Sequence, residues 1–133
     1  MNRYAKSELL GQVLSSQCPS RMVLEHLTSK WSVLVLHCLM DGVQRFSELR
    51  KRIEGVSEKM LAQTLKTLEQ DGFVLRTVYP EIPPKVEYQL TFLGAQAAEK
   101  LNYFIQWIEM NFPDVVAAQH ASQSSLHSNL PSI

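Results

Sequence analysis

The chain lacks the features that mark several large classes of protein. It has two cysteines, Cys18 and Cys38, in 133 residues, which is too few for a disulfide framework. No apolar run approaches the roughly 20 residues of a membrane-spanning helix, and the first residues do not have the pattern of a signal peptide. We therefore expect a cytoplasmic protein without a membrane partner, in which both thiols stay reduced.

The patterns of enzymes and cofactor-binding proteins are missing as well. The sequence has no glycine-rich phosphate loop, no acids paired for acid–base chemistry and no Ser–His–Asp order. A metal site of Cys18, His26 and Cys38 would not have the spacing of a zinc site. A thiol enzyme using Cys18 is an alternative, but it would need a base, and none lies near Cys18 in sequence. We predict no enzyme activity, no cofactor and no metal.

Charge is balanced overall but unevenly distributed. Thirteen Lys and Arg against thirteen Asp and Glu give a net charge of zero, which argues against a generally basic nucleic-acid binder. Residues 44–76 nevertheless hold seven cationic side chains against five acidic ones, whereas residues 77–133 hold two against five. The length allows one domain with a modest core, and the small cationic excess lies in its middle.

That middle segment has the pattern of two helices joined by a sharp turn. A short helix is expected over residues 46–52, Glu54-Gly55 is typical of a turn, and Ser57 is a favourable N-cap for a second helix. In the second helix, leucines recur at spacings that bury one face: Leu61, Leu65 and Leu68. Asp71-Gly72 is expected to end it. The pattern predicts a helix-turn-helix.

Two strand-like segments follow the second helix. Residues 74–79 and 86–90 are rich in β-branched and aromatic side chains. Pro80, Pro83 and Pro84 lie between them and favour a stiff loop over a tight turn. The predicted fold class is α+β and mainly helical, a winged helix-turn-helix with dimerisation helices at both ends. Such a fold suits duplex DNA, because the second helix fits the major groove and the wing reaches the flanking backbone.

The face of the second helix opposite its leucines carries the candidate DNA-reading residues. Gln can pair with adenine, Lys can donate to guanine and Met can pack on a thymine methyl group. The candidates are Ser57, Lys59, Met60, Gln63, Lys66 and Thr67. Arg45, Arg76 and Lys85 are candidates for phosphate contact from the wing region. Two alternatives remain open: a solvated helix face, and a winged-helix module that binds protein instead of DNA.

Both ends of the chain carry surplus apolar residues. Leu9, Leu10, Val13 and Leu14 have the spacing of a short amphipathic helix. A long helix over residues 92–112, capped by Thr91, has more apolar positions than one face needs, among them Leu101, Phe104, Trp107 and Ile108. We predict a homodimer built from both stripes, with two recognition helices about 34 Å apart on a palindromic operator. Alternatively, these residues complete the monomer core, or border a crevice for an apolar effector.

Several motifs resemble one family. RFSELRKRIEGVSEKMLAQTLKTLEQDGFVLR, then PPKVEYQLTFLG, with CPS at residues 18–20 and KW at residues 30–31, are similar to HxlR-type winged-helix transcriptional regulators of bacteria. The resemblance spans about residues 18–112. It implies a sequence-specific regulator of transcription, expected to be a repressor. The expected organisation is a dimerisation arm over 1–17, the HxlR-type domain over 18–112 and a mobile tail over 113–133.

Cys18 is the candidate sensor of a chemical signal. It precedes Pro19 at a predicted helix N-terminus, with Arg21 one turn inside, and both a helix dipole and a cation favour the thiolate. Several members of the family that the chain resembles have a cysteine here and sense electrophiles or oxidants through it. The alternative is a cysteine that only packs in a dimer contact. Cys38 lies in the most apolar predicted helix, so we expect a buried, inert thiol.

Overall fold

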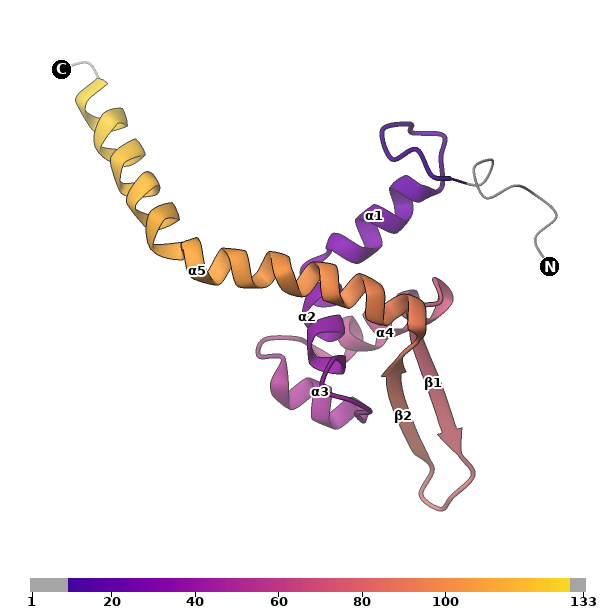
Figure 1. Ribbon diagram of the computed structural model, residues 1–133. Helices are drawn as coiled ribbons and strands as arrows, with labels where there is room; N and C mark the ends of the chain where they lie inside the picture. Colours follow the sequence, from indigo (N-terminus) through magenta and orange to yellow (C-terminus); the bar gives the residue numbers. More distant parts are fainter. Residues whose placement is uncertain (1–9, 130–133) are drawn as a thin grey trace. The chain divides into compact units, whose positions relative to one another are not determined.

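The computed structural model describes residues 10–129, with side chains described as far as residue 125. The elements in chain order are α1 (Ser20–Thr28), α2 (Lys30–Leu39), α3 (Phe46–Arg52), α4 (Glu58–Gln70), β1 (Val74–Tyr79), β2 (Lys85–Leu90) and α5 (Phe92–Asn129) (Figure 1). The chain divides after Glu99 into two compact units. The first holds α1 to β2 and the start of α5, and the second holds the rest of α5.

The core of the first unit forms around α2. Val35 and Leu36 of α2 are fully buried, as are Leu49 of α3 and Leu61 of α4, and α2 contacts both of these helices. Each fully buried leucine stabilises the fold by about 2–3 kcal/mol through loss of water contact. The prediction that the leucines of α4 point inward is confirmed.

Local chemistry sets the helix-turn-helix. Gly55 has a φ of 86°, a left-handed conformation that costs glycine little, and it joins α3 to α4. The Ser57 hydroxyl then accepts a hydrogen bond from the Met60 backbone N–H at 3.1 Å, as an N-cap should. Further along, Gly94 packs so closely on the chain that a Cβ there would lie 1.8 Å from the carbonyl oxygen of Phe73.

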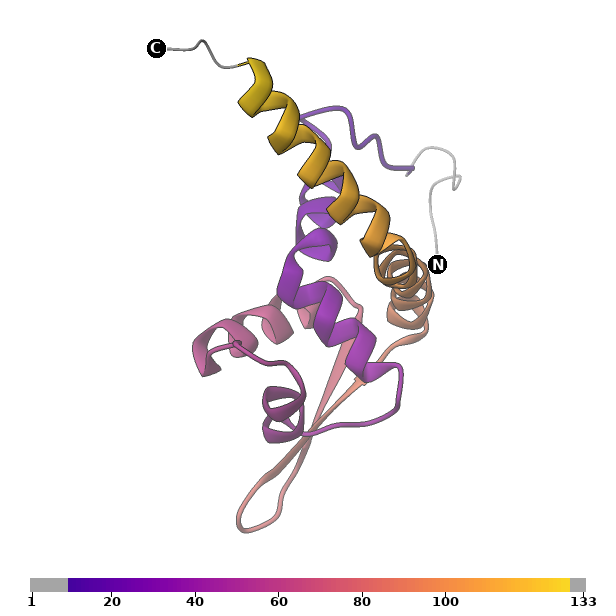
Figure 2. The ribbon, with the colours of Figure 1, turned by 90° about the vertical axis from the view of Figure 1, so that its left-hand side faces the viewer.

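The wing is an antiparallel pair. The register runs from Val74 opposite Leu90 to Tyr79 opposite Lys85, so β2 begins one residue before the predicted strand. A single bridge between Gln44 and Tyr88 ties the segment before α3 to the wing. Figures 1 and 2 both show the two strands projecting beyond the helices α1 to α4. The predicted winged helix-turn-helix is confirmed.

The predicted N-terminal helix is wrong for residues 10–14, and Leu9 lies outside the described residues. Residues 10–19 form turns without a helix. The guanidinium of Arg21 donates to the carbonyl oxygens of Val13 and Leu14, at 3.1 and 2.7 Å. Because a side chain from α1 satisfies these carbonyls, the segment bonds back onto α1 without helix formation.

The predicted end of the last helix at Phe112 is also wrong. α5 continues to Asn129 with Pro113 inside it, and the helix bends partway along its orange to yellow part (Figure 1). Proline removes one backbone donor and costs about 3 kcal/mol within a helix, but its fixed φ is compatible with a first helical turn. The residues that follow include good helix formers such as Ala117, Ala118 and Gln119.

Candidate nucleic-acid interface

One exposed face of α4 carries the residues predicted to read DNA. Lys59, Gln63 and Lys66 are exposed, opposite the buried leucines. Of the other predicted residues, Ser57 and Met60 are exposed and Thr67 is half-buried. The face is cationic and amide-bearing because the sequence places its apolar residues on the other side of the helix. It can offer donors and acceptors to base edges.

Part of this face borders α1. Met60, Gln63 and Thr67 line a cavity of about 190 Å³, together with Glu25 and His26 of α1 and residues at the start of α2. The amide of Gln63 lies 3.5 Å from the Thr67 hydroxyl, at the long limit of a hydrogen bond. The position of α1 therefore affects the surroundings of Met60 and Gln63 on α4.

The three predicted phosphate ligands differ in how accessible their charged groups are to a phosphate. Arg45 and Arg76 are exposed. Lys85 is half-buried, lies 3.0 Å from a Glu87 carboxylate oxygen, and sits over the Tyr79 ring with 5.1 Å between its Nζ and the ring centroid. A phosphate would have to compete with Glu87 for the Lys85 ammonium, so Arg76 is the better placed cation of the wing.

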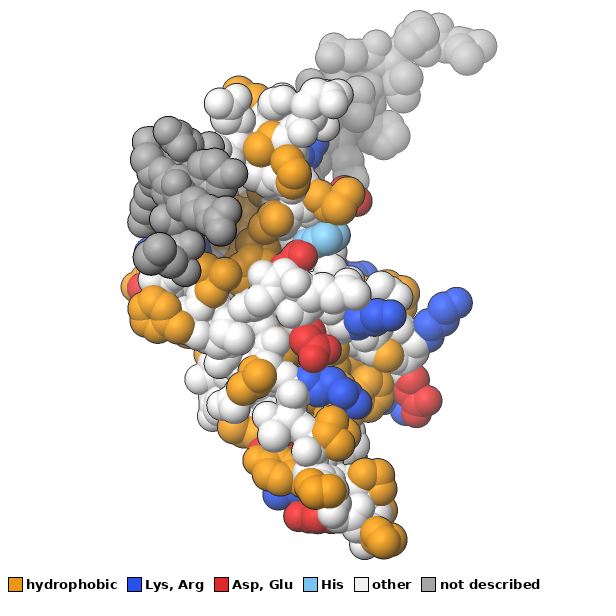
Figure 3. Space-filling model, turned by 90° about the vertical axis from the view of Figure 1, so that its right-hand side faces the viewer, with side chains coloured by type: hydrophobic (Ala, Val, Ile, Leu, Met, Phe, Trp, Pro, Cys, Tyr) orange, Lys and Arg blue, Asp and Glu red, His pale blue; other side chains and the backbone are white. Residues whose placement is uncertain are grey.

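A basic run at the end of α3 is absent from the predicted contacts, although it is visible in the sequence as Arg50-Lys51-Arg52. Arg50 pairs with Glu58 of α4 at 2.8 Å, and Arg52 pairs with Asp41 at 2.6 Å. Lys51 is exposed between them. Figure 3 shows Lys and Arg side chains gathered above the wing with acidic ones beside them, and hydrophobic side chains on the wing itself. The run adds Lys51 to the candidate phosphate ligands.

Cys18 has polar partners other than those predicted. Its Sγ accepts from the Gln12 backbone N–H at 3.3 Å and lies 3.0 Å from the Ser20 hydroxyl. These hydrogen bonds, that of Ser20 first, lower the pKa of the Cys18 thiol. The prediction that Arg21 lowers the pKa of Cys18 is wrong. The Arg21 guanidinium donates to loop carbonyl oxygens instead, and it is not among the causes of the lowered pKa. Cys38 is buried, and burial raises its pKa, in keeping with an inert thiol.

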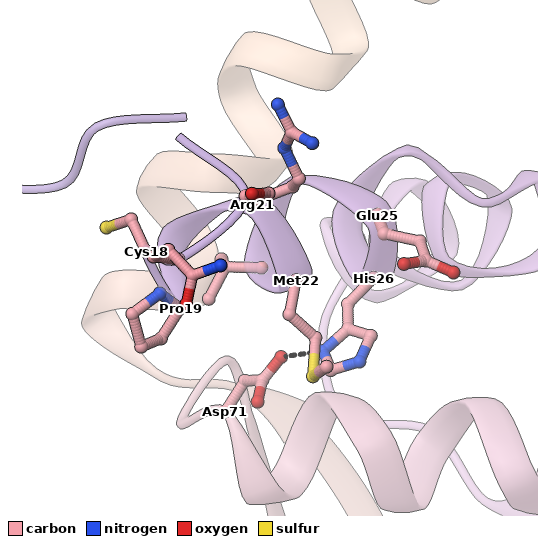
Figure 4. A pocket seen from close by; sticks show the side chains of 10 residues that line it. Cys18, Pro19, Arg21, Met22, Glu25, His26 and Asp71 are labelled. Carbon is pink, nitrogen blue, oxygen red and sulfur yellow. Dashed lines mark hydrogen bonds and ion pairs between the residues drawn. The ribbon is translucent and has the colours of Figure 1, made fainter. Parts of the chain in front are cut away.

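A cavity of about 470 Å³ lies beside this cysteine. Pro19, Met22 and Val23 form apolar walls, and Asp71 at the end of α4 closes one side. In Figure 4 the Cys18 sulfur points away from His26 and Asp71, whose side chains are joined by a dashed line. The His26 Nδ1 and Asp71 Oδ2 atoms are 2.6 Å apart. No sequence signal links residues 45 positions apart, so this pair was not predicted.

The predicted dimer residues of α5 belong largely to the second unit. Phe104 and Trp107 are 60% and 56% exposed, Ile108 is also exposed and Leu101 is half-buried. Leu10, Val13 and Leu14 of the N-terminal segment are exposed too. Within residues 10–129 no three His, Cys, Asp or Glu side chains are grouped as metal ligands, and no helix there has the length and apolarity to cross a membrane.

Comparisons with known proteins agree with this architecture. The chain is 56% identical over 109 residues to the HTH-type transcriptional regulator YtfH of Escherichia coli (strain K12), covering 82% of this chain and 86% of that one. A solved structure of a YtfH regulator from Salmonella typhimurium superposes with a TM-score of 0.80 at 54% identity, over 84% of this chain and 99% of that one.

A second solved structure is of a redox regulator, HypR, in its oxidized form. It has a TM-score of 0.65 and 36% identity, and the match covers 71% of this chain and 97% of that one. The model of the HxlR-like helix-turn-helix family matches residues 26–115, which hold α2, the helix-turn-helix and the wing. Because this match covers more than half of the chain and the relatives are described as transcriptional regulators, this chain belongs to the HxlR-like helix-turn-helix family.

Proposed function

We propose that the chain binds duplex DNA in a sequence-specific manner and regulates transcription by repressing a nearby gene. The observation that carries this is the exposed face of α4, where Lys59, Gln63 and Lys66 lie together in the same unit as the wing. Major-groove readout needs donors and acceptors on an exposed helix, and phosphate contacts from flanking elements fix the register. A bacterial regulator of this kind acts in the cytoplasm.

The direct test is binding to genomic fragments, followed by identification of the bound sequence. We expect one or a few fragments to bind tightly, and random DNA to bind weakly with an affinity that falls steeply as salt rises, because bound cations release counterions. Binding to the selected fragment should exceed binding to random DNA by about 10³-fold or more. Equal affinity for all fragments at every salt concentration would contradict sequence-specific binding.

The main alternative is a winged helix that binds protein. The wing carries exposed apolar side chains, including Val78 and Ile82, which a protein partner could cover. The cationic face of α4 favours DNA, because protein-binding faces tend to lack charge at their centre. Loss of DNA binding in the double variant Lys59→Ala with Lys66→Ala would support the proposal of DNA binding, whereas a wild type that binds no DNA fragment would favour the alternative.

We further propose that the DNA-binding form is a homodimer. A twofold dimer places two α4 helices on a palindromic operator, about one DNA turn apart. Support comes from the aromatic and aliphatic residues exposed along the second unit, which include Phe104, Trp107 and Ile108. Exposed apolar patches of this kind are typical of protein interfaces.

A chemical signal through Cys18 is the last part of the proposal. The thiol is partly accessible and its pKa is lowered, which is the environment of reactive cysteines. The relative HypR is a redox regulator, which supports the same class of signal here. An electrophile or oxidant would modify Sγ at the junction of the N-terminal segment and α1.

Operator binding before and after treatment with a quinone, an aldehyde or hypochlorous acid tests the sensor. We expect release of the wild type, and no release of Cys18→Ser. Cys38→Ser, once shown to be folded, is the matched control and should respond as the wild type does. Release of Cys18→Ser, or equal reactivity of both thiols by mass spectrometry, would contradict the sensor proposal and indicate that Cys18 only packs.

A further inference from the structure

The contact between His26 and Asp71 joins the ends of two helices. His26 lies in the last turn of α1, and Asp71 is the C-cap of α4. Their side chains are 29% and 20% exposed, and 2.6 Å separates Nδ1 from Oδ2. At this depth the pair is screened by salt less than a surface pair would be. A short hydrogen bond to a carboxylate is also among the stronger kinds.

His26 also lies between two cavities. On one side is the cavity of about 470 Å³ that Cys18, Met22 and Asp71 border (Figure 4). On the other is the cavity of about 190 Å³ that Met60 and Gln63 border. His26 therefore borders both the cavity next to Cys18, the candidate sensor, and the cavity next to Met60 and Gln63, which are candidate DNA-reading residues.

We propose that His26 is a positioning residue for DNA readout: through Asp71 it holds the end of α4 against α1. The inference rests on the proposed DNA-binding function. Bidentate pairing with a base demands distances of about 2.7–3.2 Å at each atom. A small shift or tilt of α4 would therefore weaken readout by Gln63 while leaving looser phosphate contacts nearly intact.

The test measures fluorescence anisotropy of operator and random DNA with the full chain. His26→Gln and Asp71→Asn should each lower operator affinity about tenfold, with the double variant no worse than either, because the two residues act as one pair. Affinity for random DNA should stay within about twofold.

Glu25→Gln is the matched control, because Glu25 borders both cavities without an ion pair among the described contacts. It should bind both operator and random DNA as the wild type does. Thermal unfolding is checked for every variant. If the single variants unfold, the exchanged pair H26D/D71H, which retains opposite charges, should restore operator affinity.

Additive losses in the double variant, or equal losses on random DNA, would overturn the proposal. So would failure of the folded exchanged pair to recover binding. A wild type that binds no DNA would instead refute the proposed function itself, and the two failures are thereby distinguished.

Discussion

At the scale of single residues, side chains of the same type differ in what their surroundings allow. Gln63 and Gln44 are both amides. Gln63 is exposed on α4, whereas Gln44 is buried and donates to the Cys38 carbonyl. Cys18 and Cys38 are both thiols, and their pKa values are shifted in opposite directions, the first by hydrogen bonds and the second by burial. Exposure and partners therefore select Gln63 and Cys18 as functional candidates.

The first residue-scale prediction concerns base readout. Gln63→Ala should weaken operator binding by about 1–3 kcal/mol, because an amide that pairs with a base edge is lost. Random DNA should be bound nearly as before. Gln70→Ala, an exposed amide near the other end of α4, serves as the control in the same anisotropy titrations. A loss of equal size on both DNAs would show that Gln63 does not read bases.

The second residue-scale prediction concerns the Cys18 thiolate. The Ser20 hydroxyl is the first cause of the lowered pKa of Cys18, so Ser20→Ala should raise that pKa. Less thiolate would then be present at pH 7, and alkylation of Cys18 by iodoacetamide should slow severalfold, whereas rates at pH 10 should converge. Mass spectrometry of Cys18 at a series of pH values measures this. Ser16→Ala should match the wild type, and an unchanged pH profile in Ser20→Ala would contradict the assignment.

At the scale of elements, the proposed contacts to DNA divide between α4 and the wing. The helix bears amide and ammonium groups suited to base edges, and the strands and α3 bear cations suited to phosphates. The wing pairs its own charges, since Lys85 lies against Glu87. Such a partly exposed ion pair contributes little to stability. It does engage the Lys85 ammonium, so that Arg76 is the more available cation for DNA.

A prediction follows for the wing. Arg76→Ala should weaken binding to operator and random DNA alike, and lower the salt dependence by about one phosphate contact. Lys85→Ala should have a smaller effect, because Glu87 already holds the ammonium. Salt titrations of both variants decide this. Glu87→Gln should strengthen binding by freeing Lys85, and a larger loss from Lys85→Ala than from Arg76→Ala would reverse the assignment.

At the scale of the whole molecule, the question is how a small winged helix gains specificity. In general one recognition helix reads few base pairs, whereas two on a palindrome read twice as many, and their binding free energies add. The exposed apolar residues of the second unit, which include Phe104 and Trp107, are the surface proposed for such pairing. Dimerisation and operator affinity should therefore change together.

The whole-molecule prediction tests that link. Phe104→Glu should shift the protein from dimer to monomer at micromolar concentration, because a carboxylate would be buried in an apolar interface. Operator affinity should fall by orders of magnitude in parallel. Analytical ultracentrifugation and anisotropy measure the two effects. Gln106→Glu, an exposed position on the same helix, controls for added charge. A monomer that still binds a palindrome tightly would contradict the dimer.

Much of the fold could be predicted from sequence because it depends on local chemistry. The Ser57 cap, the glycine turn before α4 and the leucine spacing act within a few residues. The two incorrect predictions, the N-terminal helix and the end of the last helix, lie where other interactions outweighed local preference. Arg21 of α1 bonds the carbonyls of Val13 and Leu14, and Pro113 is carried inside a continuing helix.

The sequence by itself determined the family, the helix-turn-helix and the polar face of α4, because periodicity and capping are written into neighbouring residues. Only the tertiary structure decided that Ser20 and Gln12, not Arg21, act on Cys18, and that Glu87 holds Lys85. It also placed His26 against Asp71. Such contacts depend on side-chain direction and on how helices pack, and no spacing along the chain records either.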